Sequence, residues 1–290
     1  MQASVAEASV AEAAAAQGNK DIDDLYKLER VHAEQLMALQ KSTAADPEFE
    51  RERQELLRAM VDMVKEHKVH SSVVYLAAAM LDLCHVLRKG QEYNLQVQAL
   101  AVFVLSVKFN GTYTKELSLS AFCKSWKQRL GIRHDAFAVR HVRAAEVELF
   151  ELLEWRLNVA TANRFLEAFL ATHVKTDDLL NEWAAFFVDL GVMHMRFTAY
   201  APSVLALASI LASRSMLDLE PVGAPELVTL YGATSVQDML HPCVQELLEH
   251  YNTHVGNTQA PQYKVLYTFT DSGIVEEDHR MLDYGLADAR

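Results

Sequence analysis

Two residues of opposite charge stand out, one in a long and otherwise apolar helical segment and the other in a second helical segment rich in apolar residues. Lys108 lies near the end of the run Leu95–Phe109, and Glu146 lies within residues 142–166. A lysine ammonium offers three hydrogen-bond donors and a carboxylate offers acceptors, so together they could hold a polypeptide backbone of either polarity. Such hydrogen bonds would serve to bind another protein. Taken singly, a lysine ending an apolar helix more often reaches to solvent, and a glutamate followed by Glu148 and Glu151 more often lies on a solvated face.

Motifs that would support catalysis or metal binding are missing from the sequence. It contains no phosphate-binding glycine-rich loop, no Gly-x-Ser-x-Gly and no His-Glu-x-x-His. Glu29-x-x-His32 matches one half of a di-iron site, which needs a second copy. His250 and His254 are one helical turn apart, with His241 and Cys243 upstream, but we interpret them as ordinary surface or core residues. We expect no catalytic residue, no metal and no cofactor.

Composition favours a helical protein that binds another protein. Of 290 residues, 51% are hydrophobic and only 10 are Gly and 6 Pro, so a sizeable helical core is available. The net charge of -12 argues against nucleic-acid and anionic-membrane binding but suits a basic protein surface. Three scattered cysteines are typical of a reducing compartment. We expect a soluble protein without a signal peptide or membrane span, since the longest uncharged apolar stretch, residues 200–213, is too short.

Hydrophobic periodicity predicts an all-α fold of two tandem five-helix units with an N-terminal flanking helix. Residues 1–19 are interpreted as a mobile alanine-rich tail, and 20–46 as the flanking helix, over about 21–39, with its linker. The first unit covers 47–160, the second covers 161–255, and 256–290 form an extended strap. The helices are predicted over residues 48–67, 73–87, 95–109, 116–130 and 136–157, then 163–172, 177–196, 202–217, 224–231 and 235–254.

Five segments together resemble the cyclin family over roughly residues 20–270. Residues 95–109 and 142–166 resemble the two signature helices of the cyclin box, and 69–82 resemble its second helix. In the second half, residues 196–206 and 241–248 resemble A- and B-type cyclins. The resemblance implies a regulatory subunit, itself not an enzyme, that binds and activates a cyclin-dependent serine/threonine kinase and controls cell-cycle progression. It also implies protein substrates or inhibitors as further partners, and a nuclear and cytoplasmic location.

The resemblance implies a kinase-binding face centred on Lys108 and Glu146, which in the family hydrogen-bond main-chain groups beside the kinase αC helix. Other residues at matching positions are Leu105, Phe109, Phe150, Trp155 and Leu157, with Ile22 and Tyr26 on the flanking helix. Binding there would stabilise the αC-in state of the kinase. We expect both charged residues at the surface, so that replacing both by Ala removes kinase activation and leaves stability nearly unchanged.

The chain departs from the family pattern in three places. The substrate-docking patch would correspond to Arg53, Leu56 and Met60, but the tryptophan that follows it in many cyclins is missing, which argues against a working groove. Asn110-Gly111 replaces an acidic pair, and about nine extra residues near 127–135 are interpreted as a surface loop. The alternatives are a regulator of a transcriptional or nutrient-sensing kinase and, disfavoured by the charge of -12, a DNA-bound general transcription factor.

Overall fold

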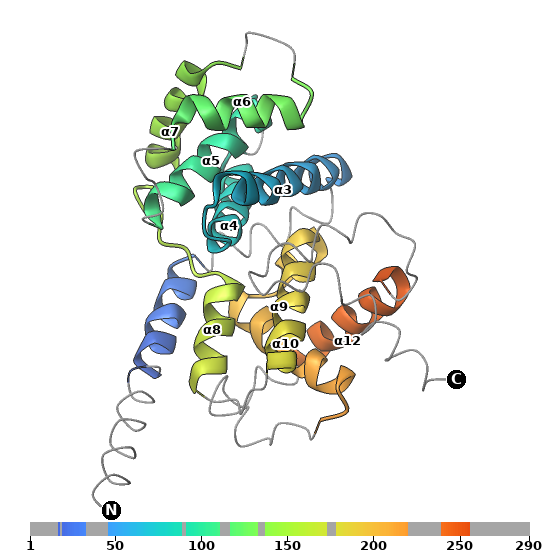
Figure 1. Cartoon of the computed structure of the whole chain (residues 1–290). Coiled ribbons are helices and arrows are strands. Elements are labelled where there is room, and N and C mark those ends of the chain that lie inside the picture. Colours follow the sequence, from blue (N-terminus) through green and yellow to red (C-terminus); the bar gives the residue numbers. More distant parts are fainter. Residues whose placement is uncertain are drawn as a thin grey trace, which may run out of the picture.

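A computed structural model describes residues 17, 19–32, 46–88, 91–110, 117–132, 137–172, 178–219 and 239–255. Regular structure within these ranges is helical throughout, with no strand, which confirms the all-α prediction. Figure 1 shows two helical bundles, one formed by α3–α7 and the other by α8–α12. None of the helices in the described ranges has the length and apolar character needed to cross a membrane.

The first unit is a five-helix bundle in which α3, α5 and α6 begin at side-chain caps. Asp46 accepts a hydrogen bond from the Phe49 amide at 3.0 Å at the start of α3, and Asn94 and Ser118 cap α5 and α6 in the same way. The helices are α3 (Pro47–His67), α4 (Ser72–Leu87), α5 (Leu95–Phe109), α6 (Leu119–Arg129) and α7 (Val139–Leu152).

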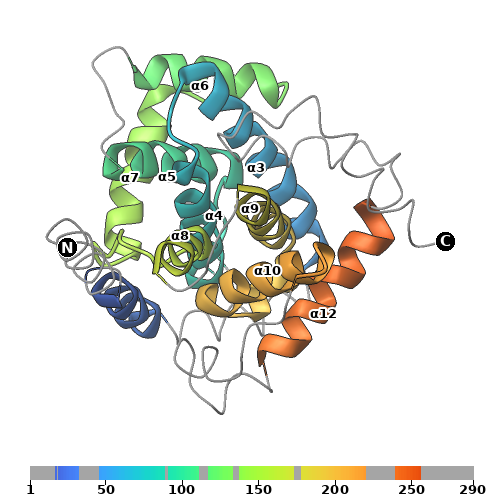
Figure 2. The same cartoon turned by 60° about the horizontal axis from the view of Figure 1, so that its bottom comes forward.

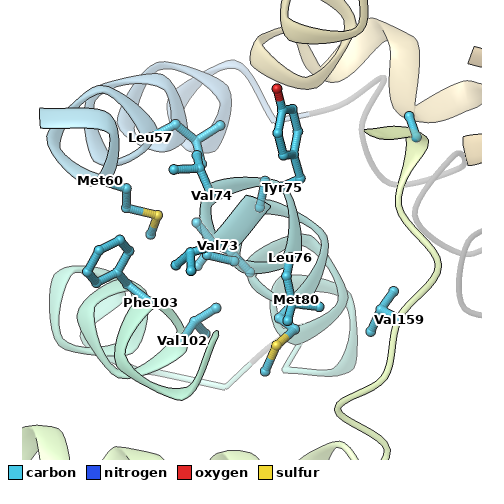
Figure 3. Packing of buried hydrophobic residues seen from close by; sticks show 14 of the residues in the cluster. Leu57, Met60, Val73, Val74, Tyr75, Leu76, Met80, Val102, Phe103 and Val159 are labelled. Atoms are coloured by element: carbon cyan, nitrogen blue, oxygen red, sulfur yellow. The ribbon is translucent and has the colours of Figure 1, made fainter. Parts of the chain in front are cut away.

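Helix α5 is the centre of this bundle, as its apolar pattern predicts. Every residue from Val97 to Val107 is buried, because α3, α4, α6 and α7 all pack against it. Figure 3 shows Val102 and Phe103 of α5 close to Met60 of α3 and Val73 of α4. This packing fixes the last turn of α5 and therefore the place where Lys108 leaves the core.

The second unit repeats the arrangement around α10. Its described elements are α8 (Ala162–Thr172), α9 (Asp178–Met193), the 3-10 helix η1 (Met195–Ala199), α10 (Pro202–Met216), α12 (His241–His250) and the π-helical turn η3 (Tyr251–Val255). Helix α10 packs against α8, α9 and α12. Helices α9 and α10 approach closely at Gly191, where a Cβ atom would lie 2.6 Å from Cδ1 of Leu205. The fourth predicted helix of this unit, over 224–231, lies outside the described residues.

Buried polar contacts join the two units. Arg53 of α3 binds Asp82 of α4 through Nε at 2.6 Å and donates to the Met193 carbonyl at the end of α9. The Tyr75 hydroxyl of α4 donates to the Asp189 carboxyl of α9 at 2.6 Å, and its ring points away from the other labelled core side chains (Figure 3). Apolar packing is also continuous between the units. The two bundles therefore share one core.

The N-terminal helix, over residues 19–31, is fastened to the second unit. Figures 1 and 2 both place it beside α8. Glu29 accepts hydrogen bonds from the Ser203 amide and hydroxyl, each at 2.8 Å, at the start of α10. The residue before α10, Ala201, has no side chain that could cap it, so a carboxylate from a distant helix takes that role.

Two predicted helix ends are wrong. The helix predicted over 136–157 ends at Leu152 in the structure, because Glu154 and Trp155 adopt left-handed backbone angles, with φ of 49° and 62°. The helix predicted over 177–196 ends at Met193 and is followed by a 3-10 turn. The flanking helix, predicted to about residue 39, is described as far as Val31 with a turn at His32, and its predicted end lies outside the described residues. Residues 33–45, the strap beyond 255 and most of the 1–19 tail lie outside the described residues.

Candidate partner-binding site

Lys108 and Glu146 form an ion pair between the last turn of α5 and the middle of α7. The Lys108 Nζ donates to Glu146 Oε1 at 2.5 Å. Glu146 is only 7% exposed, because its side of α7 packs on α5. The expectation that Glu146 is a surface group is therefore wrong. Lys108 is the group that reaches solvent, with a side chain 43% exposed, so the pair is buried on its acidic side and open on its basic side.

An open hollow of about 580 Å³ lies beside this ion pair. Its lining is apolar apart from three charged residues, one of which is the buried Glu146. The lining residues are Leu105, Lys108, Phe109, Arg143, Glu146, Val147, Phe150 and Leu157. Six of them, Lys108, Glu146, Leu105, Phe109, Phe150 and Leu157, are residues that the sequence analysis assigned to the binding face.

Two large exposed apolar side chains line this hollow, Phe109 and Val147, and a third, that of Trp155, stacks on the lining residue Phe150. Phe109, Val147 and Trp155 are 46%, 59% and 73% exposed, whereas side chains of this kind are ordinarily covered. Trp155 stacks on Phe150, with ring centroids 4.8 Å apart and planes 28° from parallel. Its left-handed backbone lets its amide donate to the Phe150 carbonyl at 2.8 Å. The turn after α7 therefore holds an indole against the rim of the hollow at the cost of unfavourable φ angles.

The interior next to Glu146 contains a thiol that stays neutral. Burial raises the pKa of Cys123, and the Glu146 carboxylate adds to that effect. A thiol with a raised pKa is a poor nucleophile. The site therefore presents apolar surface and charge, and its chemistry is that of binding.

Ile22 and Tyr26, also assigned to the binding face, do not line the hollow. Ile22 is buried, and the Tyr26 ring lies 5.2 Å from that of Phe165 on α8. Their assignment to a kinase contact remains a prediction. In the described structure Ile22 belongs to the core shared by both units, and Tyr26 packs the N-terminal helix on α8.

Arg53, Leu56 and Met60, the residues at the docking-patch positions, are all buried. Arg53 binds Asp82 and the Met193 carbonyl, and the other two side chains belong to the core of the first unit. None of the three offers a side-chain surface to a peptide in this conformation. Burial thus adds to the missing tryptophan as an argument against docking at these positions.

Arg143 and Val147 line the hollow and were not identified from the sequence. They precede Phe150 on α7 by seven and three residues, so helical spacing places them on the same face of α7 as Phe150. Glu146 lies between them in the sequence. That spacing is the signal that could have found them. An exposed arginine and an exposed valine on a charged helix are otherwise unremarkable.

The histidines near the end of the second unit pack as aromatic rings. His250 lies 4.3 Å from His194 and 4.5 Å from His254, centroid to centroid. Burial lowers the pKa of His194 to about 3 and that of His250 to about 4. Among the residues that the structure describes, no group of three or more His, Cys, Asp or Glu is placed to hold a metal ion.

Comparison with known proteins identifies family models for both halves of the chain. The model of the cyclin N-terminal domain matches residues 24–158, and that of the cyclin C-terminal domain matches residues 160–268. The G2/mitotic-specific cyclin S13-6 of Glycine max is 26% identical over 233 residues, which are 80% of this chain and 48% of that protein. The chain thus spans about half the length of this relative.

Two solved structures share the fold. One is a chain of the yeast RNA Pol II CTD kinase CTDK-1 complex, with a TM-score of 0.57 and 13% identity, covering 75% of this chain and 71% of that one. The other is a viral cyclin from herpesvirus saimiri, with a TM-score of 0.52 and 18% identity, covering 75% of this chain and 96% of the viral one. At sequence identities this low, the similarity shows a shared fold and nothing more.

Proposed function

The chain belongs to the cyclin family, and from that premise we propose that it binds and activates a cyclin-dependent serine/threonine kinase through the hollow between α5 and α7. The observation that carries the proposal is the Lys108–Glu146 ion pair, set among exposed apolar side chains. Core residues are covered in a folded monomer, so a cluster of exposed Phe109, Val147 and Trp155 is typical of a surface that a partner covers. Two charges within such a surface would fix the partner's register.

The mechanism is a shift between two states of the kinase. A protein kinase is active when the glutamate of its αC helix pairs with its strand lysine and its metal-binding loop is in place. The hollow would receive the αC region in its inward position, with Trp155 and Phe109 covering apolar side chains on either side. Because only the inward state offers this complementary surface, binding favours that state. The cyclin supplies no catalytic group, and the kinase carries out phosphoryl transfer.

Cell-cycle control is the role we propose for the complex. It is supported by the relative from Glycine max, which is named as a G2/mitotic-specific cyclin. A location in the nucleus and cytoplasm goes with that role, and the buried, unpaired Cys84, Cys123 and Cys243 suit a reducing compartment. Protein substrates or inhibitors of the kinase would be further partners. The alternative, a transcriptional kinase as partner, shares the same fold and the same binding face.

Co-purification tests the proposal directly. The tagged full chain is expressed in eukaryotic cells, recovered, and assayed for a stoichiometric kinase and for kinase activity that depends on the chain. Trp155→Ala is the matched variant: its side chain is 73% exposed, so stability should hardly change, while kinase recovery should fall by about tenfold or more. Lys124→Ala, on the exposed side of α6, is the control. A wild-type chain that recovers no kinase would refute the proposal.

Two further assays separate the alternatives. Activity of the recovered kinase on a peptide copied from the RNA polymerase II C-terminal domain, in place of cell-cycle substrates, would favour the transcriptional role. A salt-sensitive shift of duplex DNA by the chain alone would favour a DNA-bound factor. A dependence of cell division on the wild-type chain, lost with Trp155→Ala, would support the proposed cell-cycle role.

A further inference from the structure

The hollow between α5 and α7 has a charge opposite to that of the chain. Its lining carries two cations, Lys108 and Arg143, and one carboxylate, Glu146, whereas the chain as a whole has a net charge of -12. The carboxylate is buried and already bound to Lys108. The charge that the rim presents to an approaching partner is therefore positive.

Arg143 is the residue that makes the rim positive. It lies one helical turn before Glu146 and Val147, on the side of α7 that faces the hollow, and is exposed to solvent. Among the residues that the structure describes, no carboxylate pairs with its guanidinium, although Lys108, Arg88 and Arg129 all have one. Of the acids that follow on α7, Glu148 is five residues away and projects from another side of the helix, and Glu151 is eight residues away, roughly 12 Å along the helix axis.

A partner that fills the hollow will cover part of Arg143. Covering a cation removes water from it, and this costs binding free energy unless the partner supplies hydrogen-bond acceptors. A carboxylate matches the planar fork of the guanidinium in two hydrogen bonds. A lysine or arginine at the same place would meet two cations of the rim at short range.

We propose that Arg143 selects among kinases by pairing with an aspartate or glutamate on the surface that enters the hollow, and that it rejects kinases with a basic residue there. This deepens the proposed function and rests on it. Lys108 and Glu146 would hold any kinase of the class, if they bind main-chain groups as the family resemblance implies, because main-chain groups are common to all kinases. Arg143 would distinguish one member from another, because it binds a side chain that differs between kinases.

The test is a binding panel with purified monomeric cyclin-dependent kinases as probes. Each kinase is titrated with wild type, Arg143→Met, Arg143→Glu and the control Lys124→Glu, which makes the same charge change on α6. For kinases that bind wild type, we expect Arg143→Met to weaken binding about two- to fivefold at 0.15 M salt and Arg143→Glu about tenfold or more. Lys124→Glu should change it less than twofold. The effect of Arg143→Glu should shrink at high salt, where exposed charges are screened.

A charge exchange completes the test. Exposed acids on and beside the kinase αC helix are replaced one at a time by Lys, and one such kinase should bind Arg143→Glu better than wild type. Arg143 has no selective role if Arg143→Glu binds every kinase as tightly as wild type does, or if Lys124→Glu loses as much affinity as Arg143→Glu. Either result shows that the inference is wrong and leaves the proposal of kinase binding intact. If no kinase replacement restores binding, the acidic partner is refuted. If wild type binds no kinase, the proposed function itself fails.

Discussion

Removing the Lys108 ammonium should destabilise the protein more than removing both members of its ion pair. Glu146 is 7% exposed and holds Lys108 at 2.5 Å, whereas the lysine side chain is 43% exposed. In Lys108→Ala a buried carboxylate loses its cation. In Glu146→Ala the freed lysine turns into water. The double variant leaves neither charge in the interior.

The different exposures of Glu146 and Lys108 determine how much stability each variant should lose. Breaking a fully buried ion pair by removing one partner costs about 3–5 kcal/mol, and breaking an exposed one costs about 0–1 kcal/mol. A pair buried on one side lies between these, so we expect Lys108→Ala to lower the free energy of unfolding by about 2 kcal/mol. Glu146→Ala and the double variant should each cost about 1 kcal/mol, mainly through lost packing of the buried side chain. The coupling energy of the pair is then about 2 kcal/mol.

Urea unfolding followed by circular dichroism measures these differences, provided that the slope of the transition is the same for all variants. In a thermal melt, 2 kcal/mol corresponds to a shift of roughly 4–8 °C for a protein of this size. The Asp24–Lys27 pair on the N-terminal helix, whose side chains are largely exposed, is the matched control and should show no measurable coupling. All three Lys108 and Glu146 variants should lose kinase binding, including the double variant that regains stability.

Either of two results would refute this reasoning. If the double variant is as unstable as the two single losses combined, the residues do not interact in the folded chain. If Glu146→Ala costs more than Lys108→Ala, the carboxylate is held by something other than the lysine. Either outcome would also remove the basis for a preformed binding pair.

Three further predictions concern groups away from the hollow. Burial raises the pKa of Asp189 well above its usual range, so the folded state favours the protonated acid, and its contribution to stability is lost as pH rises above the unfolded value near 4. Asp189→Asn, which still accepts from Tyr75, should therefore raise the melting temperature at pH 7 and lose this advantage near pH 4. His194 and His250 have pKa values lowered to about 3 and 4, so the unfolded chain takes up protons first and stability falls as pH drops below about 6.5; melts of His194→Gln combined with His250→Gln should show a flatter decline between pH 7 and 4. Glu29→Ala removes the cap of α10 and should cost about 1–2 kcal/mol, with faster amide hydrogen exchange in residues 19–31, whereas Lys27→Ala on the same helix should leave that exchange unchanged.

The helical framework follows from sequence where local signals and burial agree. The segment 95–109 is apolar all round and bounded by Asn94 and Asn110, and the structure has the helix at these residues. The end of α7 could not be predicted in this way. Leu153 and Leu157 continue the apolar spacing, and no glycine marks the turn at which Glu154 and Trp155 take positive φ angles. At this turn the Trp155 ring stacks on Phe150, a packing contact that apolar spacing along the sequence does not indicate.

The site was predictable only as far as family resemblance carried it. Lys108, Phe109 and Phe150 match recognisable positions, and the structure brings them to one hollow. The burial of Glu146 was missed because it depends on a lysine 38 residues away, a contact that helical periodicity does not contain. Arg143 was missed because an exposed arginine becomes informative only once its lack of a carboxylate partner is seen.

The preformed ion pair has a consequence for how the surface binds. Association is weakened by every side chain that must be ordered on contact. Glu146 is already fixed by burial and by Lys108, and Trp155 is already stacked on Phe150, so little ordering remains for them to undergo. In the proposed function, this common part of the site would act as a preformed, ordered surface that favours one kinase state. Arg143 and Val147 remain exposed at its edge, and differences in partner choice are expected to arise from residues of this kind, whose contacts form only in the complex.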